Sequence, residues 1–153
     1  MQKLTPLLLS GLLVFGVAAC DNASKTSESA PNNPNESPQA PTAQTTQASQ
    51  NDAQSEVRRK QANSDIRARE QRNNTTGGDA QRAKGDLASE VRSKLEVNIP
   101  KSQLTVDAAD NGTVTVGGTV NNQQELAKIE KLAKEIKGVK SVVVKATVLP
   151  PKP

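Results

Sequence analysis

The fold of this chain is decided by residues 110–120, which read DNGTVTVGGTV. Asp110-Asn111-Gly112 is a strong signal for a β-hairpin turn, because these residue types accept the backbone conformations that such turns require. After the turn, valines alternate with threonines from Thr113 to Val120, which predicts a strand with one apolar and one polar face. The preceding residues 103–108 alternate in the same way. The sequence therefore predicts an antiparallel hairpin with one face that must be buried.

A helix is predicted on the N-terminal side of the hairpin. Asp86 is a candidate N-cap, and Leu87, Val91 and Leu95 recur at a spacing of four residues, which is typical of a helix with one apolar face. Pro100 prevents the helix from continuing, because the residue before a proline avoids the helical conformation.

A second helix and a last strand are predicted after the hairpin, at residues 124–137 and 141–149. The helix carries its apolar side chains within one arc, and Gly138 follows it where a left-handed C-cap belongs. We assign structural turn and cap roles to Gly112, Gly118 and Gly138.

The apolar faces of the three strands need a cover. Their inward-pointing residues are leucine, valine and alanine at 104, 106, 108, 114, 116, 120, 142, 144, 146 and 148. The two amphipathic helices are the only available cover, so the predicted fold is α+β, a small two-layer αββαβ domain over residues 79–149. The simplest interpretation of the threonine-rich outer face is a solvated surface, and the alternative is a surface for a partner or a second copy. Residues 150–153 form a proline-rich tail.

This pattern resembles the BON domain, named for bacterial osmotic-stress and nodulation proteins. The two most specific parts are NGTVTVGGTV at residues 111–120 and GVKSV at residues 138–142. The resemblance implies an αββαβ domain of envelope proteins that binds phospholipid or other envelope partners and supports envelope integrity under osmotic stress. It does not imply an enzyme. Well-known members carry two copies and this sequence shows one, so functions that need the pair are not implied.

The N-terminus has the features of a bacterial export signal. Lys3 provides a positive charge, and residues 7–17 form an apolar run that is shorter than the roughly 20 residues of a membrane span. The run ends in Val17-Ala18-Ala19-Cys20, which resembles the lipoprotein box. We expect removal of residues 1–19 as a lipoprotein signal peptide and lipidation of Cys20. The alternative is ordinary secretion with cleavage before Cys20, which would leave a single reactive thiol.

Residues 20–78 are predicted to be the lipidated cysteine and a disordered tether. Residues 21–55 are rich in Asn, Ser, Pro and Gln and lack large apolar side chains, so nothing offsets the entropy of ordering them. A free coil from Cys20 to Gly85 would span about 45 Å r.m.s., at roughly 5–6 Å × √n. We expect a lipid-anchored protein of the bacterial envelope on the periplasmic side, and the sequence leaves the leaflet open.

One stretch of the tether differs in composition. Residues 56–72 contain six basic and three acidic side chains. Val57, Ala62 and Ile66 make a poor apolar stripe, so we expect only a weak charged helix. Its simplest interpretation is a solvated segment, and the alternative is attraction of its basic side chains to anionic lipid headgroups.

The candidate contact surface is the cationic side of the second predicted helix. It consists of Lys128, Lys131, Lys134, Lys137 and Lys140. Lysines with long apolar stems can lie against anionic phospholipid or contact an envelope protein. The alternative is a solvated helix face on which glutamates pair with neighbouring lysines.

The composition excludes several kinds of chemistry. The chain has 153 residues with no histidine and one cysteine, which excludes imidazole catalysis, histidine–metal sites and an internal disulfide. No phosphate loop or nucleophile–base pair is present, Asp107 and Asp110 lack the spacing of a calcium loop, and Glu90 and Glu96 are expected on exposed helix faces. We assign no catalytic residue, cofactor or metal. Nucleic acid is a poor fit, because the predicted domain has no aromatic side chain to stack on a base.

Two classes of function remain. The first is a membrane-tethered module that binds phospholipid or envelope components. The second is a non-catalytic protein–protein interaction adaptor that its lipid holds at the membrane.

Overall fold

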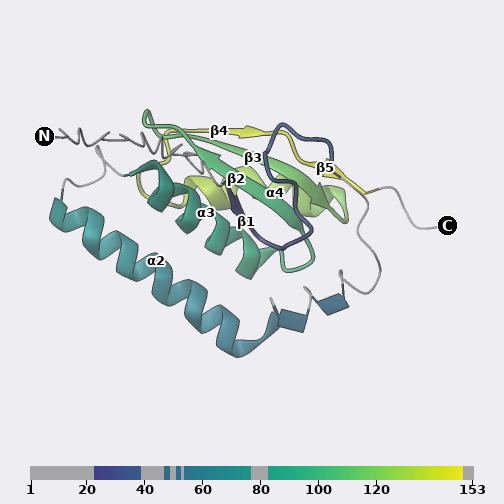
Figure 1. Ribbon diagram of the computed structural model, residues 1–153, viewed down its shortest axis with the longest axis horizontal. Coiled ribbons are helices and arrows are strands. Elements are labelled where there is room, and N and C mark those ends of the chain that lie inside the picture. The colour runs from purple at the N-terminus through teal and green to yellow at the C-terminus, as the bar shows by residue number, and fades with distance from the viewer. Residues whose placement is uncertain (1–22, 39–46, 49–50, 53, 77–82, 150–153) are drawn as a thin grey trace, which may run out of the picture.

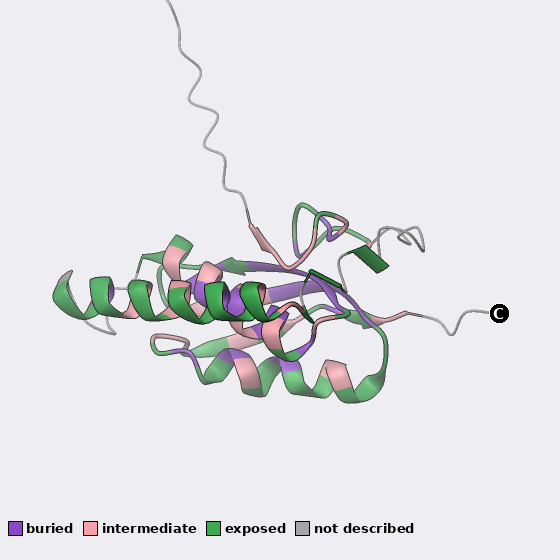
Figure 2. Ribbon diagram, turned by 90° about the horizontal axis from the view of Figure 1, so that it is seen from below, coloured by how far each residue is buried: buried purple, intermediate pink, exposed green. Residues whose placement is uncertain are grey.

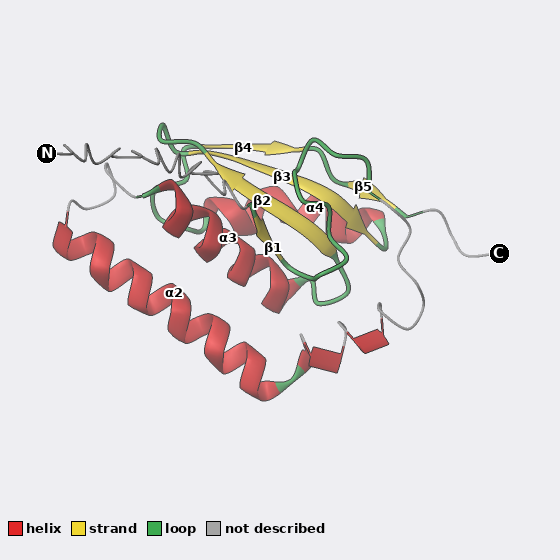
Figure 3. Cartoon of the chain, viewed as in Figure 1, coloured by secondary structure: helices red, strands yellow, loops and turns green. Residues whose placement is uncertain are grey.

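A computed structural model describes residues 23–38, 47–48, 51–52, 54–76 and 83–149. Over these residues the chain has an α+β fold with three helices and a mixed sheet (Figures 1 and 3). The elements in chain order are β1 (Ser24–Lys25), α2 (Glu56–Thr76), α3 (Lys84–Asn98), β2 (Gln103–Ala108), β3 (Thr113–Val120), α4 (Gln123–Lys134), β4 (Ser141–Val144) and β5 (Thr147–Val148).

The sheet is built on the predicted hairpin. β2 and β3 pair antiparallel, with Val106 opposite Val116, and both β4 and β5 run parallel to β3. The predicted last strand is therefore present in two pieces, interrupted opposite Gly117 and Gly118. The sheet order β1-β2-β3-β4 contains a strand that the three-stranded prediction did not include, because β1 adds to the free edge of β2.

The core lies between the inner sheet face and two helices, which confirms the predicted packing. The strand side chains Leu104, Val106, Val114, Val116 and Val120 are completely buried. α3 and α4 cover them with the apolar residues Leu87, Val91, Leu95, Ile129 and Ala133 (Figure 2). The core is aliphatic throughout, so burial of Leu, Ile and Val provides its main stabilisation.

The hairpin turn also holds the last strand. The Ala109 and Thr113 backbones close the turn through a 2.9 Å hydrogen bond, and Gly112 adopts a φ of 81°. The Gly112 carbonyl then accepts a hydrogen bond from the Lys140 amide at 2.9 Å. The turn therefore connects β3 to the chain that enters β4, where Gly138 has a φ of 90°.

The ends of the two core helices differ from the prediction. α3 begins at Lys84, and its N-cap residue is Ala83, so the prediction of Asp86 as N-cap is wrong. Asp86 lies in the first turn of α3, where its carboxylate forms an ion pair with Arg69 of α2. α4 starts after Asn122, whose side chain accepts a hydrogen bond from the Glu125 amide at 2.8 Å, and it ends at Lys134, before the predicted residue 137.

The charged stretch at 56–72 belongs to a longer helix than predicted. α2 spans 21 residues, Glu56–Thr76, and packs along α3 on the side away from the sheet (Figure 1). Among the α2 residues whose burial the structure describes, only Ala62 and Asn73 are buried. Apolar burial therefore contributes little to this contact, and its charged and polar pairs become important.

The outer face of the sheet carries a cover that the sequence did not predict. Residues 24–36, here called the strap, begin with β1 and cross β2 and β3 (Figure 1). Thr105 and Thr119 of the outer face are buried, so the prediction of a solvated threonine face is wrong at these positions. The hydroxyl of Thr105 donates to the carbonyl of Pro31 in the strap.

Candidate functional site

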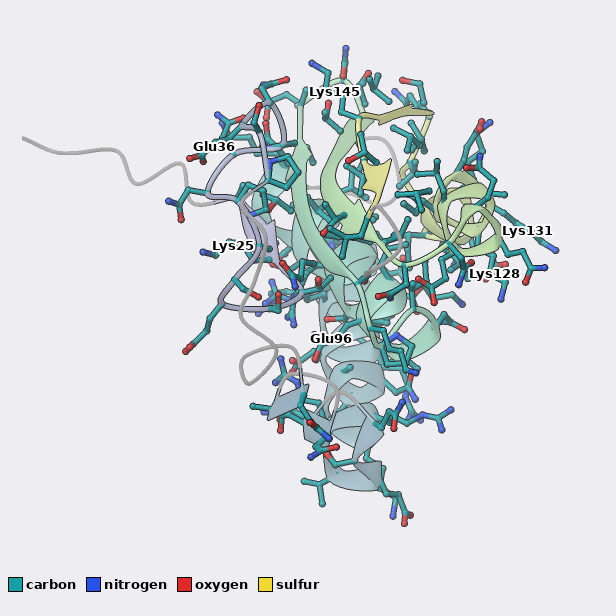
Figure 4. The ribbon with its side chains drawn as sticks, turned by 90° about the vertical axis from the view of Figure 1, so that its right-hand side faces the viewer. Lys25, Glu36, Glu96, Lys128, Lys131 and Lys145 are labelled. Carbon is teal, nitrogen blue, oxygen red and sulfur yellow. The ribbon has the colours of Figure 1, made fainter. Side chains whose placement is uncertain are left out.

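The five lysines of the candidate surface form one exposed face, here called the lysine face. It runs along α4 and continues through the turn into β4, and it consists of Lys128, Lys131, Lys134, Lys137 and Lys140, all of which are exposed. Ile129 and Ala133 of α4 are completely buried, which orients the helix so that the lysines point to solvent. Figure 4 shows Lys128 and Lys131 extending from the side of the molecule opposite to Lys25.

Acidic neighbours neutralise only part of the lysine face. Glu130 pairs with Lys134 at 2.6 Å, and Glu125 turns back to accept a 2.9 Å hydrogen bond from the Asn121 amide. Glu135 pairs with Lys94 of α3 at 2.8 Å. Within the described residues, four of the five lysines have no ion-pair partner, namely Lys128, Lys131, Lys137 and Lys140. The face therefore presents excess positive charge.

The Lys94–Glu135 pair links α3 to α4 beside the lysine face. The pKa of Glu135 is lowered, first by the hydrogen bond from Lys94, then by the charge of Lys94 and to a smaller extent by that of Lys131. A carboxyl group whose pKa is lower in the folded state stabilises the fold at neutral pH, and this contribution disappears as the pH falls through the folded-state pKa.

We predict that an NMR titration will place the midpoint of Glu135 below that of an ordinary glutamate. Lys94→Gln removes the main cause, so it should raise the midpoint toward the ordinary value. Lys60→Gln is the matched control, because Lys60 pairs with Glu56 on α2 and should leave Glu135 unchanged. Equal midpoints in Lys94→Gln and the unsubstituted protein would contradict the assignment.

A second charged cluster lies between α2 and α3, and the sequence pattern did not predict it. Glu96 of α3 is 3% exposed and accepts hydrogen bonds from two arginines. Arg58 of α2 approaches it at 2.6 Å, and Arg92 of α3 at 2.7 Å. The pKa of Arg58 is raised, first because Glu96 accepts a hydrogen bond from its guanidinium. This cluster connects the start of α2 to the end of α3.

The same interface continues toward the start of α3. Asn73 donates to Glu90 at 3.4 Å, and Glu90 is completely buried. Asp86 pairs with Arg69, and with Arg72 at 3.5 Å. The prediction that Glu90 and Glu96 sit on exposed faces is therefore wrong, because α2 covers that side of α3.

One sequence signal could have indicated this interface. Glu90 follows Asp86 by four residues, which places both on one side of a helix, and Arg69 and Arg72 lie three residues apart in the preceding charged stretch. The pattern matches two antiparallel helices whose facing sides carry opposite charge, arginines on one and carboxylates on the other. It could not be assigned, because residues 56–72 lack an apolar stripe that would predict packing.

A shallow cavity opens beside Glu96, with a volume of about 530 Å³. Lys25 and Arg58 contribute positive charge to its lining, and Asp52, Glu28 and Glu96 contribute negative charge. The mixed lining gives no clear preference for a ligand of either sign.

The remaining predicted features are outside the described residues or are absent from them. Cys20 and the signal peptide, residues 1–19, lie outside the described ranges, as does the tail at 150–153. Among the residues that the structure describes, no acidic or cysteine side chains gather in a group that could hold a metal ion. In the same ranges, no helix has the length and apolar character needed to cross a membrane.

The fold and the lysine face define a small α+β domain with a basic surface and no assigned catalytic group. Residues 83–150 match the family model of the BON domain, in agreement with the resemblance predicted from the sequence. BON domains are associated with phospholipid binding and with osmotic-stress proteins, and proteins that contain them are typically envelope-associated. The comparison with curated proteins gives no match.

Proposed function

We propose that this chain is a non-catalytic lipoprotein of the bacterial envelope whose single BON domain binds anionic phospholipid through the lysine face. The supporting observation is the set of exposed lysines on α4 and the turn after it that have no ion-pair partner among the residues the structure describes. Their stems can rest on the bilayer surface while their ammonium groups contact phosphate oxygens. In this proposal the Cys20 lipid anchors the chain on the periplasmic side, and the domain supports envelope integrity under osmotic stress.

The proposal assigns lipid contact to α4 and not to the basic side chains of α2. Three arginines of α2 already pair with carboxylates of the domain, namely Arg58, Arg69 and Arg72. Their charge is therefore largely engaged within the molecule. Lys128 and Lys131 have no such partner among the described residues and extend from the domain surface.

We predict that Lys128→Gln/Lys131→Gln will weaken the binding of residues 21–153 to vesicles that contain phosphatidylglycerol. Each lysine near an anionic surface contributes about 1 kcal/mol, so the loss should be roughly thirtyfold. Binding to these vesicles should also fall as the salt concentration rises, because added ions screen the attraction. Co-sedimentation over a vesicle concentration series measures the affinity.

Arg59→Gln/Arg67→Gln is the matched control. It removes the same charge from exposed positions on α2 and should change binding by less than the α4 variant. An equal loss in both variants would indicate a dependence on net charge alone. If the unsubstituted chain binds no vesicle of any composition, phospholipid binding is wrong, and the protein-interaction adaptor becomes the favoured function.

A further inference from the structure

The strap crosses the outer face of the sheet, and its described contacts there are hydrogen bonds and a short strand pairing, with little apolar burial. β1 is only two residues long, and Ser24 and Lys25 pair with Val106 and Thr105 of β2. Thr26 extends the pairing, since its amide donates to the Leu104 carbonyl and its hydroxyl accepts from the Leu104 amide, both at 2.8 Å. The strap therefore pairs with the free edge of β2 over only three residues, Ser24, Lys25 and Thr26.

The body of the strap is polar and rests on a polar surface. Of its side chains, only those of Ala30, Pro31 and Pro34 are buried. On this outer face of the sheet, Gln103 Oε1 and Thr119 Oγ1 are buried without a hydrogen-bond partner among the described residues. A cover that leaves buried polar atoms unpaired is bound less firmly than one that satisfies them. These features are those of a segment that can detach while the domain stays folded.

Docking of the strap changes the length of chain between Cys20 and the folded domain. With β1 paired, four residue steps separate Cys20 from Ser24, which reach at most about 14 Å. With the strap released, the first fixed element is α2, and the 36 steps from Cys20 to Glu56 span roughly 30–36 Å r.m.s. as a coil. Strap docking therefore more than halves the expected separation.

Docking also determines which side of the domain is held near the lipid. The strap residues Lys25 and Glu36 lie on one side of the molecule, and Lys128 and Lys131 lie on the opposite side (Figure 4). A short connection at β1 therefore directs the lysine face away from the bilayer in which Cys20 is anchored. Release of the strap removes this restriction.

We propose that the strap is a reversible restraint on lipid binding. When docked, it holds the domain close to the lipidated N-terminus with the lysine face turned away, and when released, it allows that face to reach the same bilayer. The proposal rests on the function proposed above, namely lipidation at Cys20 and phospholipid binding by the lysine face.

Gly117→Ala is the sharpest test of strap docking. A Cβ atom at Gly117 would lie 2.1 Å from the Pro34 carbonyl oxygen and 2.5 Å from Pro34 Cα, so the strap backbone must move. Thr105→Val is a second variant that removes the hydroxyl bonded to Pro31 and retains a side chain suited to a strand. Both changes act on strap contacts, so the sheet should remain folded.

The first measurement is hydrogen exchange of the full lipidated chain in nanodiscs containing phosphatidylglycerol. In the unsubstituted protein, peptides from residues 24–36 should be protected. In Gly117→Ala they should exchange about tenfold faster or more, while β3 peptides keep their protection. Absence of protection in the unsubstituted strap would overturn the proposal, as would unchanged strap exchange in both variants.

The second measurement is energy transfer from a fluorophore on an introduced Ala127→Cys to acceptor lipids in the same discs. Ala127 lies on α4 beside Lys128, and the acylated sulfur of Cys20 does not compete for the label. Transfer should increase when Gly117→Ala releases the strap. Equal transfer despite faster strap exchange would overturn the orientation claim. Failure of phospholipid binding itself is detected separately, because unlipidated residues 21–153 would then not bind vesicles.

Discussion

Gly118→Ala is expected to destabilise the α+β domain by about 3–5 kcal/mol, which is a large part of the roughly 5–15 kcal/mol that holds a typical domain folded. The backbone φ of Gly118 is 108°, a value that residues other than glycine rarely adopt. A Cβ atom there would also lie 2.0 Å from the Gln103 carbonyl oxygen of the paired strand. Urea unfolding followed by circular dichroism measures the loss.

Gly85→Ala is the matched control for this prediction. A Cβ atom at Gly85 has no neighbour within 4 Å, and Gly85 lies in α3, where alanine is favoured over glycine by about 1 kcal/mol. This variant should be slightly more stable than the unsubstituted protein. If Gly118→Ala unfolds at the same urea concentration as the unsubstituted protein, then β2 and β3 do not approach each other at Gly118 as closely as in the structure.

The central part of the fold could be predicted because local patterns and packing agree there. The alternation in Thr113–Val120 and the turn at Gly112 predicted β3 and its pairing with β2. The apolar arc of residues 124–137 predicted which side of α4 is buried. In each case the residues that define the element also bury its apolar face, so the sequence carries the information locally.

The additional elements could not be predicted because their stability depends on distant residues. α2 has almost no apolar face. Its contact with α3 includes the pair between Arg58 and Glu96, which lie 38 residues apart in the sequence. The strap consists of residues typical of disordered chain, and it is held by a few bonds such as that between Thr105 and Pro31, 74 residues apart. Polar contacts of this kind leave no periodic pattern in the sequence.

The same reasoning explains how the candidate site was found and what was missed. The lysines at 128, 131, 134 and 137 recur at a spacing of three and lie on the solvent side of an amphipathic helix, so their positions follow from helix geometry. Helix geometry does not tell which of these lysines remain unpaired. That depends on Glu135, which pairs with Lys94 of α3, and on Glu125, which accepts a hydrogen bond from the Asn121 amide. The structure thereby directs the test to Lys128 and Lys131.

Glu96→Ala is expected to destabilise the protein by about 3 kcal/mol and to loosen the contact between α2 and α3. The substitution removes the shared carboxylate of Arg58 and Arg92, whose side chains are 32% and 17% exposed. The two guanidinium groups then lose their strongest acceptor and repel each other in a partly desolvated site. Urea unfolding gives the free energy, and hydrogen exchange of residues 56–76 reports whether α2 still docks.

Glu130→Ala is the matched control, because it removes another pair with an i,i+4 spacing, in this case an exposed one. Lys134 and Glu130 are 53% and 56% exposed, so their pair should contribute only about 0.5 kcal/mol. The Arg58–Glu96 and Arg92–Glu96 contacts should therefore account for most of the difference between the two variants. If Glu96→Ala costs no more than Glu130→Ala and leaves exchange in α2 unchanged, burial of Glu96 beneath α2 does not hold the two helices together.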